Sequence, residues 1–128
     1  GAIAKSFPEK GSISLEVNIE RDLFIPFNTA VDCGMVVNEL VTNSFKHAFH
    51  NLPEEGSIGR IVIETLKTGN NTLKIRVMDN GSGFDETSPD RGGMGMEIVN
   101  LLIEKMGASL ERSLNEGSGT LWTILLPV

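Results

Sequence analysis

The chain has 128 residues, of which 40% are hydrophobic and 22% are charged, as expected for one soluble globular domain that is too short to be two. Its net charge of −6 argues against nucleic-acid binding, which needs a basic surface. No apolar run reaches the roughly 18 residues of a membrane span, and no signal peptide is visible. Cys33 is the single cysteine, so no internal disulfide can form. We expect a cytoplasmic domain with a buried thiol and no direct membrane contact.

The first predicted elements are a strand and a long helix. Residues 12–19 alternate apolar and polar side chains, as a half-buried strand does. Asn28 or Thr29 begins a helix that runs to about Ala48, where a polar loop with Pro and Gly follows. Thr29 and Asp32, three residues apart, fit a capping box at the start of this helix.

Two further strands are predicted at about 60–66 and 72–78. Each is rich in β-branched and apolar residues, and the turn at 68–71 between them contains Gly and two Asn. Short turns of this composition join antiparallel strands, so the two strands are expected to form a hairpin.

The last predicted elements are a helix at about 94–106 and two strands at about 108–114 and 120–127. Gly107 follows the helix and is expected at its C′ position. Since strands and helices are mixed along the chain, the expected class is α+β, with helices layered on one face of a mixed sheet. We see no linker and no repeat, so residues 1–128 are treated as a single domain.

One side of the first helix carries a polar stripe. At about 100° per residue, Glu39, Asn43, Lys46, His47 and His50 fall within an arc of about 100°. The opposite side is mostly apolar, which burial against the sheet explains; it contains Val37, Leu40, Val41, Ser44, Phe45 and Ala48. A solvated face accounts for most stripes of this kind. Asparagine, however, is out of place in the middle of a helix unless its amide is used.

The stripe has the residue types needed around a metal-bound phosphate. Asn43 offers a neutral oxygen to Mg²⁺, which prefers oxygen ligands. Glu39, four residues earlier, can orient a water or accept a proton as a general base. Lys46 can direct an ammonium group at the same phosphates.

Asp79, Gly81 and Gly83 follow the strand that ends near residue 78. A strand-ending turn explains these residues as well as a binding site does, because Asp, Asn and Gly are common in turns. In a binding site, Asp79 would accept a hydrogen bond from the exocyclic amine of adenine. The two glycines would let the backbone approach the base.

A second glycine cluster, Gly92-Gly93-Met94-Gly95, precedes the second helix. Free N–H groups and the helix dipole make such a terminus favourable for phosphate, although loop flexibility is the simpler reading. The cluster is neither a Walker A loop nor a dinucleotide fingerprint. Met94 and Met96 are expected mainly in the core, with one of them able to line an adenine pocket. In the last turn, the Thr120 hydroxyl could join Asp79 at the base.

The four motifs occur in the order N-E-L-V-T-N-S-F-K-H-A, D-N-G-S-G-F, G-G-M-G-M-E-I-V and G-S-G-T. In this order they resemble the GHKL ATP-binding superfamily, which contains histidine kinases, type II topoisomerases, mismatch-repair ATPases and chaperones of the 90-kilodalton heat-shock class. The chain is most similar to the catalytic domain of a sensor histidine kinase. Residues 27–49 resemble the subgroup related to the HWE kinases. The resemblance covers about residues 12–128.

This resemblance implies a two-layer α/β sandwich that holds ATP and Mg²⁺ between the helices and loops over one face of a mostly antiparallel sheet. By position, Glu39 resembles the candidate base and Asn43 the magnesium ligand. Lys46 and His47 resemble the phosphate-side residues of the same helix. Asp79 resembles the adenine-binding aspartate, and Thr120 resembles the threonine that supports this contact. Gly81 and Gly83 resemble the first glycine box, and Gly93 and Gly95 the second.

The chain departs from many histidine kinases in two places. Arg91 stands where an earlier glycine is common, and residues 84–92 are too short for a long ATP lid. We expect Arg91 to supply charge to the phosphates. The chain also lacks a dimerising helical hairpin with an acceptor histidine, and we interpret His47 and His50 as polar face residues rather than as the phosphoacceptor.

The resemblance implies phosphoryl transfer from ATP to a histidine on a separate dimerisation domain of the parent protein, which would then pass the phosphate to a response regulator. A membrane anchor elsewhere in the parent protein is compatible with this expectation, and this domain alone is not expected to autophosphorylate. Two alternatives stay open. One is a stand-alone serine/threonine kinase of the anti-sigma-factor type, and the other is a degenerate ATP-binding module that docks a partner.

Overall fold

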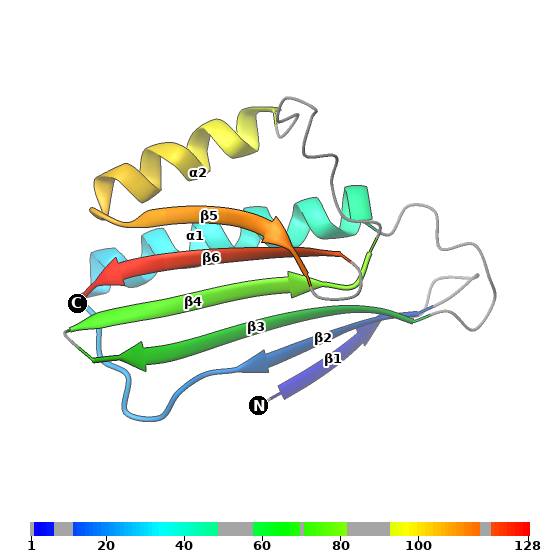
Figure 1. The fold of residues 1–128 in the computed structure, drawn as a ribbon, viewed down its shortest axis with the longest axis horizontal. Coiled ribbons are helices and arrows are strands. Elements are labelled where there is room, and N and C mark those ends of the chain that lie inside the picture. Colours follow the sequence, from blue (N-terminus) through cyan, green and yellow to red (C-terminus); the bar gives the residue numbers. More distant parts are fainter. Residues whose placement is uncertain (1, 7–11, 49–57, 70, 82–92, 116–118) are drawn as a thin grey trace.

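The computed structural model describes residues 2–6, 12–48, 58–69, 71–81, 93–115 and 119–128. These residues form a sheet and two α-helices, one of which continues into a π-helical turn (Figure 1). The strands are β1 (Ala2–Ser6), β2 (Ser12–Asn18), β3 (Ile58–Thr68), β4 (Thr72–Asp79), β5 (Ser109–Leu114) and β6 (Thr120–Pro127). The helices are α1 (Phe27–Asn43), the π-helical turn η1 (Ser44–Ala48) and α2 (Gly93–Lys105). None of the helices in these ranges is both long and apolar enough to cross a membrane.

The six strands form one sheet in the order β1-β2-β3-β4-β6-β5. Strands β2 and β3 are parallel, and each other neighbouring pair is antiparallel. A parallel pair needs a crossover connection, and α1 lies in this one. The mixed, mostly antiparallel sheet confirms the predicted α+β class. Strand β1 is an addition to the predicted elements, because its five residues contain one large apolar side chain and depend on pairing with β2.

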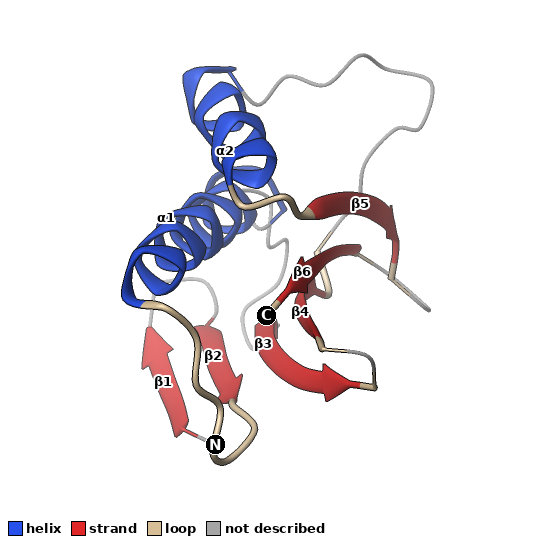
Figure 2. Ribbon diagram, turned by 90° about the vertical axis from the view of Figure 1, so that its left-hand side faces the viewer, coloured by secondary structure: helices blue, strands red, loops and turns tan. Residues whose placement is uncertain are grey.

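Both helices lie on one face of the sheet, which gives the molecule two layers (Figure 2). The core fills the space between these layers, and β4 shows how the sheet contributes to it. Leu73, Ile75 and Val77 are buried, and the residues between them are less so. Opposite them, Leu40 of α1 is completely buried. Asp79 continues the same alternation and is only 4% exposed, so the strand ends with a carboxylate on its core face.

Helix α1 begins at Phe27, slightly earlier than predicted. Its N-cap is Pro26, with φ −57° and ψ 146°, and no side chain caps the helix. The Pro26 carbonyl accepts the first hydrogen bond, from the Ala30 N–H at 2.9 Å. The predicted capping box of Thr29 and Asp32 is therefore wrong. Thr29 already lies inside the first turn, and a capping residue needs the non-helical backbone that Pro26 has here.

The C-terminal end of the first helix is a π-helical turn, Ser44–Ala48. The helix ends where predicted, but its last five residues are π-helical; the Ser44 N–H still bonds back to α1, at Leu40 O and Val41 O. A π turn has more residues per turn than an α-helix, so later side chains are rotated away from their places on an ideal wheel. Phe45 was expected on the buried side and is instead 38% exposed.

Helix α2 ends as predicted. Gly107 has φ +65°, a left-handed conformation that glycine adopts without a steric cost. Its N–H donates to Glu104 O at 3.0 Å, and the Ala108 N–H donates to Ile103 O at 3.0 Å. This pair of bonds is a Schellman motif, which satisfies carbonyl groups at the end of the helix.

Two contacts join α1 to the end of α2. Lys105 Nζ lies 3.3 Å from Asp32 Oδ2, and the Asp32 side chain is almost buried whereas that of Lys105 is mostly exposed. An exposed ammonium contributes little net energy, so the main effect of the pair is to give a buried carboxylate a partner. Next to it, Cys33 Sγ lies 3.7 Å from Met106 Sδ. The two helices are therefore fixed relative to each other at the end of α1 far from η1.

Cys33 is 7% exposed, which confirms the predicted buried thiol. Burial raises the pKa of this thiol, and the neighbouring Asp32 carboxylate raises it further. The folded protein therefore favours the neutral thiol, whose contribution to stability is complete below the unfolded-state pKa of about 8.5. That contribution is lost as the pH rises from there toward the folded-state pKa.

We predict that the free energy of unfolding falls more steeply above about pH 8.5 in the wild type than in Cys33→Ala, because only the wild type has this thiol to ionise on unfolding. Urea titrations between pH 7 and 10 would measure the difference. The native thiol should also react with iodoacetamide at pH 8 more slowly than in urea, by on the order of a hundredfold. Identical pH profiles for the two proteins would contradict the prediction.

Candidate functional site

The site is centred on the carboxylate of Asp79, the last residue of β4. Its Oδ2 accepts a hydrogen bond from Ser44 Oγ at 2.9 Å. Its Oδ1 accepts two, from the Gly81 N–H at 3.0 Å and the Thr120 N–H at 3.2 Å. An ionised carboxylate has about four acceptor positions, so these three donors, counted over the described part of the chain, leave about one position for a ligand. Because the donors come from three segments of the chain, the orientation of the carboxylate is fixed.

The backbone of Asp79 is held as firmly as its side chain. Its carbonyl oxygen accepts a hydrogen bond from Asn115 Nδ2 at 3.0 Å. Gly119 approaches the same carbonyl so closely that an added Cβ would stand 1.9 Å from the oxygen. Gly119 also has φ +101°, which other residues rarely adopt. The β5–β6 connection therefore needs glycine here in order to seat the end of β4.

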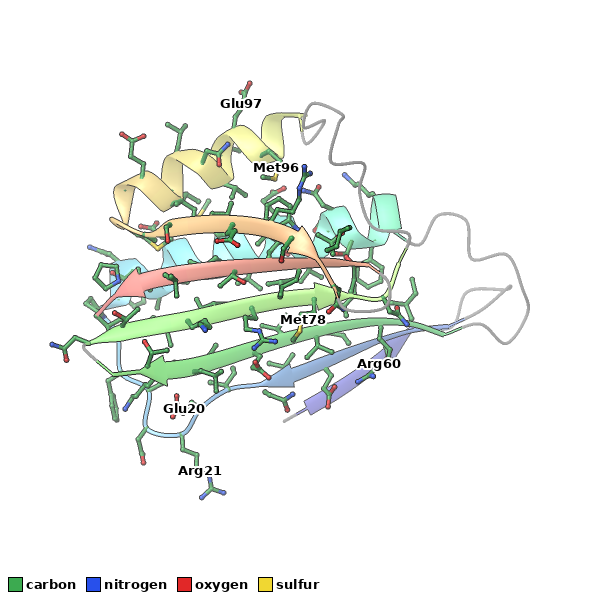
Figure 3. All side chains as sticks on the ribbon, viewed as in Figure 1. Glu20, Arg21, Arg60, Met78, Met96 and Glu97 are labelled. Carbon is green, nitrogen blue, oxygen red and sulfur yellow. The ribbon has the colours of Figure 1, made fainter. Side chains whose placement is uncertain are left out.

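The residue after Asp79 is anchored to the start of β3. Asn80 Oδ1 accepts the Arg60 N–H at 2.6 Å, and the Asn80 N–H donates to Arg60 O at 3.2 Å. Arg60 is labelled near this end of the sheet in Figure 3. These two bonds fix the direction in which the chain leaves β4.

The polar stripe on the first helix is only partly preserved. Glu39 and Asn43 lie on α1, as predicted, and are half-buried there, whereas Lys46 is exposed on η1. Asn43 immediately precedes Ser44, so the stripe and the Asp79 carboxylate meet where α1 changes into η1. The backbone of His47 also belongs to η1, and its side chain lies outside the described residues.

The first turn of α2 packs against the stripe. A Cβ added to Gly95 would stand 2.5 Å from Glu39 Oε2, so the carboxylate lies directly against the glycine backbone. Met96 is buried and its Sδ lies 3.5 Å from Asn43 Nδ2. Figure 3 shows Met96 directed toward the sheet and Glu97 directed away from it. The second glycine cluster thus adjoins both polar residues of α1.

Several predicted site residues are brought together, and others cannot be placed. Thr120 reaches Asp79 through its backbone N–H, rather than through the hydroxyl group considered in the prediction. Gly93 is the first residue of α2, and the Met94 side chain is outside the described residues. The backbone of three further predicted residues lies outside the described ranges: His50, Gly83 and Arg91.

Sequence reasoning missed two residues of the site. Ser44 was assigned to the apolar side of the helix, yet it is 4% exposed and bonds to Asp79. Asn115 was assigned to a turn, yet its amide holds the Asp79 carbonyl. For Ser44 a signal existed, because a small polar residue among buried apolar ones usually has a hydrogen-bond partner. For Asn115 no comparable signal existed.

Comparison with known proteins agrees with this geometry. A family profile described as histidine kinase-, DNA gyrase B-, and HSP90-like ATPase matches residues 28–128. Blue-light-activated histidine kinase 2 of Erythrobacter litoralis (strain HTCC2594) is 30% identical over 121 residues, which are 92% of this chain and 34% of that protein. The nitrate/nitrite sensor protein NarQ of Escherichia coli (strain K12) is 34% identical over 89 residues, which are 70% of this chain and 14% of NarQ.

Comparison with solved structures agrees with the sequence comparison. The structure of the Erythrobacter litoralis EL346 blue-light activated histidine kinase is similar with a TM-score of 0.73 and 30% identity, covering 88% of this chain and 35% of that chain. The chain therefore spans about a third or less of the length of these relatives. Because the profile match covers residues 28–128, which include every described residue of the site, the chain belongs to the histidine kinase-, DNA gyrase B- and HSP90-like ATPase family.

Proposed function

We propose that the chain binds Mg-ATP and donates the γ-phosphate to a histidine on a separate dimerisation domain of a two-component sensor kinase. The observation that carries this proposal is the buried Asp79 carboxylate, which is oriented by Ser44, Gly81 and Thr120. Among the residues that the structure describes, these donors leave it an acceptor position for one more. The exocyclic amine of adenine is a donor of the right kind. The acceptor histidine and the response regulator would lie in other parts of the signalling system.

The residues beside Asp79 fit the phosphate end of such a ligand. Asn43 directs its Nδ2 toward Met96 Sδ, so its Oδ1 is the atom that would bind a cation. A single neutral oxygen suits Mg²⁺, which takes most of its ligands from water and phosphate. When bound, Mg²⁺ would offset negative charge on the phosphates. Gly95 lies in the first turn of α2, where free N–H groups favour phosphate, and the exposed Lys46 adds a positive charge on η1.

Glu39 is the group best placed to handle a proton. Its carboxylate lies against Gly95 in the first turn of α2, next to the turn where phosphates would bind. In the proposed reaction, an imidazole nitrogen bonds to the γ-phosphorus as the bond to the bridging oxygen of ADP breaks. Glu39 would accept the proton that the ring releases. Most of the rate enhancement would come from positioning and charge stabilisation.

We predict that isothermal titration calorimetry will detect Mg-ATP binding in the micromolar to high-micromolar range. Asp79→Asn should weaken it at least about tenfold, because an amide donor would then face the amine of the base. Asn43→Ala should weaken binding with Mg²⁺ present and have little effect without it. Absence of binding by the wild-type chain would rule out the proposed function.

Gly119→Ala should destabilise the fold by about 3 kcal/mol or more, because it combines backbone strain with an overlap on the Asp79 carbonyl. It should also abolish nucleotide binding at concentrations where the wild type is saturated. Urea unfolding and calorimetry would measure both effects. Gly34→Ala is the matched control, since an added Cβ there meets nothing within 4 Å and alanine favours the helix. Equal behaviour of the two variants would contradict the assigned role of Gly119.

Phosphotransfer can be tested by adding a histidine-bearing hairpin domain of the parent protein and labelled ATP. Glu39→Gln should slow formation of acid-labile phosphohistidine by about 10²–10⁴-fold while ATP affinity changes little. Glu97→Gln is the control, because Glu97 is exposed on α2 and points away from the sheet (Figure 3). An unchanged rate in Glu39→Gln would show that Glu39 is not the base. Acid-stable phosphoserine in place of phosphohistidine would contradict the proposed acceptor.

A further inference from the structure

The Ser44 hydroxyl group must donate its hydrogen to Asp79, as a count of donors and acceptors shows. Ser44 Oγ and Asp79 Oδ2 are 2.9 Å apart and both residues are 4% exposed. An ionised carboxylate has no hydrogen to give, so Ser44 must be the donor. Since a hydroxyl carries one hydrogen, Oγ then has only lone pairs to offer to anything else. The pair therefore presents acceptors alone.

The other oxygen of the Asp79 carboxylate, Oδ1, also presents no hydrogen to a ligand. Oδ1 already accepts two backbone N–H groups, from Gly81 and Thr120, which fill its two acceptor positions. With the donors that the described residues supply, the second position on Oδ2 and the lone pairs of Ser44 Oγ are what can face a ligand. A ligand group that brings a hydrogen would satisfy them. A carbonyl oxygen would face lone pairs only, and a buried acceptor left unpaired is costly.

We propose that Ser44 is the positioning residue that makes the Asp79 site selective for a 6-aminopurine over a 6-oxopurine. This inference rests on the proposed nucleotide-binding function and adds to it the source of base selectivity. Ser44 acts in two ways, by fixing Oδ2 and by occupying the space beside it. Without the hydroxyl, a water molecule can enter and turn either a hydrogen or a lone pair toward the base. The site would then accept both kinds of purine.

The π-helical turn supports this assignment. Ser44 is the first residue of η1, and its own N–H bonds to Leu40 and Val41. Its backbone position is thus fixed by α1, while its side chain reaches a residue 35 positions later. Single π turns within helices occur often at functional sites. Consecutive residues of one helix thus serve two ends of the site, with Asn43 beside Met96 and Ser44 beside Asp79.

The test compares Mg-ATP with Mg-ITP by calorimetry on the full chain. ITP replaces the 6-amino donor with a carbonyl acceptor. We expect the wild type to prefer ATP by about tenfold or more, and Ser44→Ala to reduce this preference to about threefold or less. Ser44→Thr keeps the hydroxyl and should keep the preference. Ser113→Ala on β5 is the matched control, because Ser113 lies in register with Leu121 and outside the site, and it should behave as the wild type.

The ratio of the two affinities separates selectivity from a merely structural role. If Ser44→Ala weakens both nucleotides equally and keeps the ratio, the inference is overturned while the proposed function stands. If Ser44→Thr loses the ratio as fully as Ser44→Ala, packing rather than the hydroxyl sets selectivity, and the inference is again overturned. If the wild type binds neither nucleotide, the proposed function itself fails. Circular dichroism of each variant would establish that it is folded.

Discussion

A carboxylate buried between the layers of a small protein must be compensated, and the end of β4 is organised around this requirement. Removing an ionised group from water costs several kcal/mol unless hydrogen bonds replace the lost hydration. Asp79 receives that compensation from Ser44, Gly81 and Thr120. Hydrogen bonds to a charged group contribute about 1.5–3 kcal/mol each, so the three together can offset a penalty of this size. The fold can therefore keep an anionic acceptor where a strand would normally bury an aliphatic side chain.

The sheet order explains how these donors reach one carboxylate. β6 is the immediate neighbour of β4, which brings the Thr120 amide and Gly119 to the last residue of β4. β5 is the next strand along, and Asn115 directly follows it. The helix layer supplies Ser44 from above the same end of the sheet. The remaining polar residues of the site lie on the same helix or pack against it, so they follow from the placement of α1.

Much of the architecture is readable from local sequence patterns. The alternation along β4, the glycine that ends α2 and the turn residues between strands each act through short-range chemistry, and each is found where expected. Asn43 was identified because asparagine is unusual in the middle of a helix, Glu39 because it lies four residues earlier on the same stripe, and Asp79 because its motif belongs to the ordered series. The class of fold was therefore predictable, and the candidate site contains residues that the sequence had indicated.

The features that were not predictable depend on partners far along the chain. The capping pattern at Thr29 and Asp32 was correct in spacing, but Asp32 pairs with Lys105, 73 positions away. Ser44 was assigned to the apolar side of the helix, and its role was missed because its partner is 35 positions later. The exposure of Phe45 follows from a change in helix type that no periodicity reveals. In the first two cases a tertiary contact overrode a local preference.

The long sequence separations around Asp79 have a thermodynamic consequence. Its donors include residues 35 and 41 positions away, so the unfolded chain contains nothing equivalent to the site. A ligand that fills the site binds the native state alone, and its binding energy becomes folding energy by mass action. At a ligand concentration one hundred times the dissociation constant, this linkage adds about 2.7 kcal/mol to stability. An occupied site would then keep the sheet and helices assembled, and the domain would be least stable when its ligand is scarce.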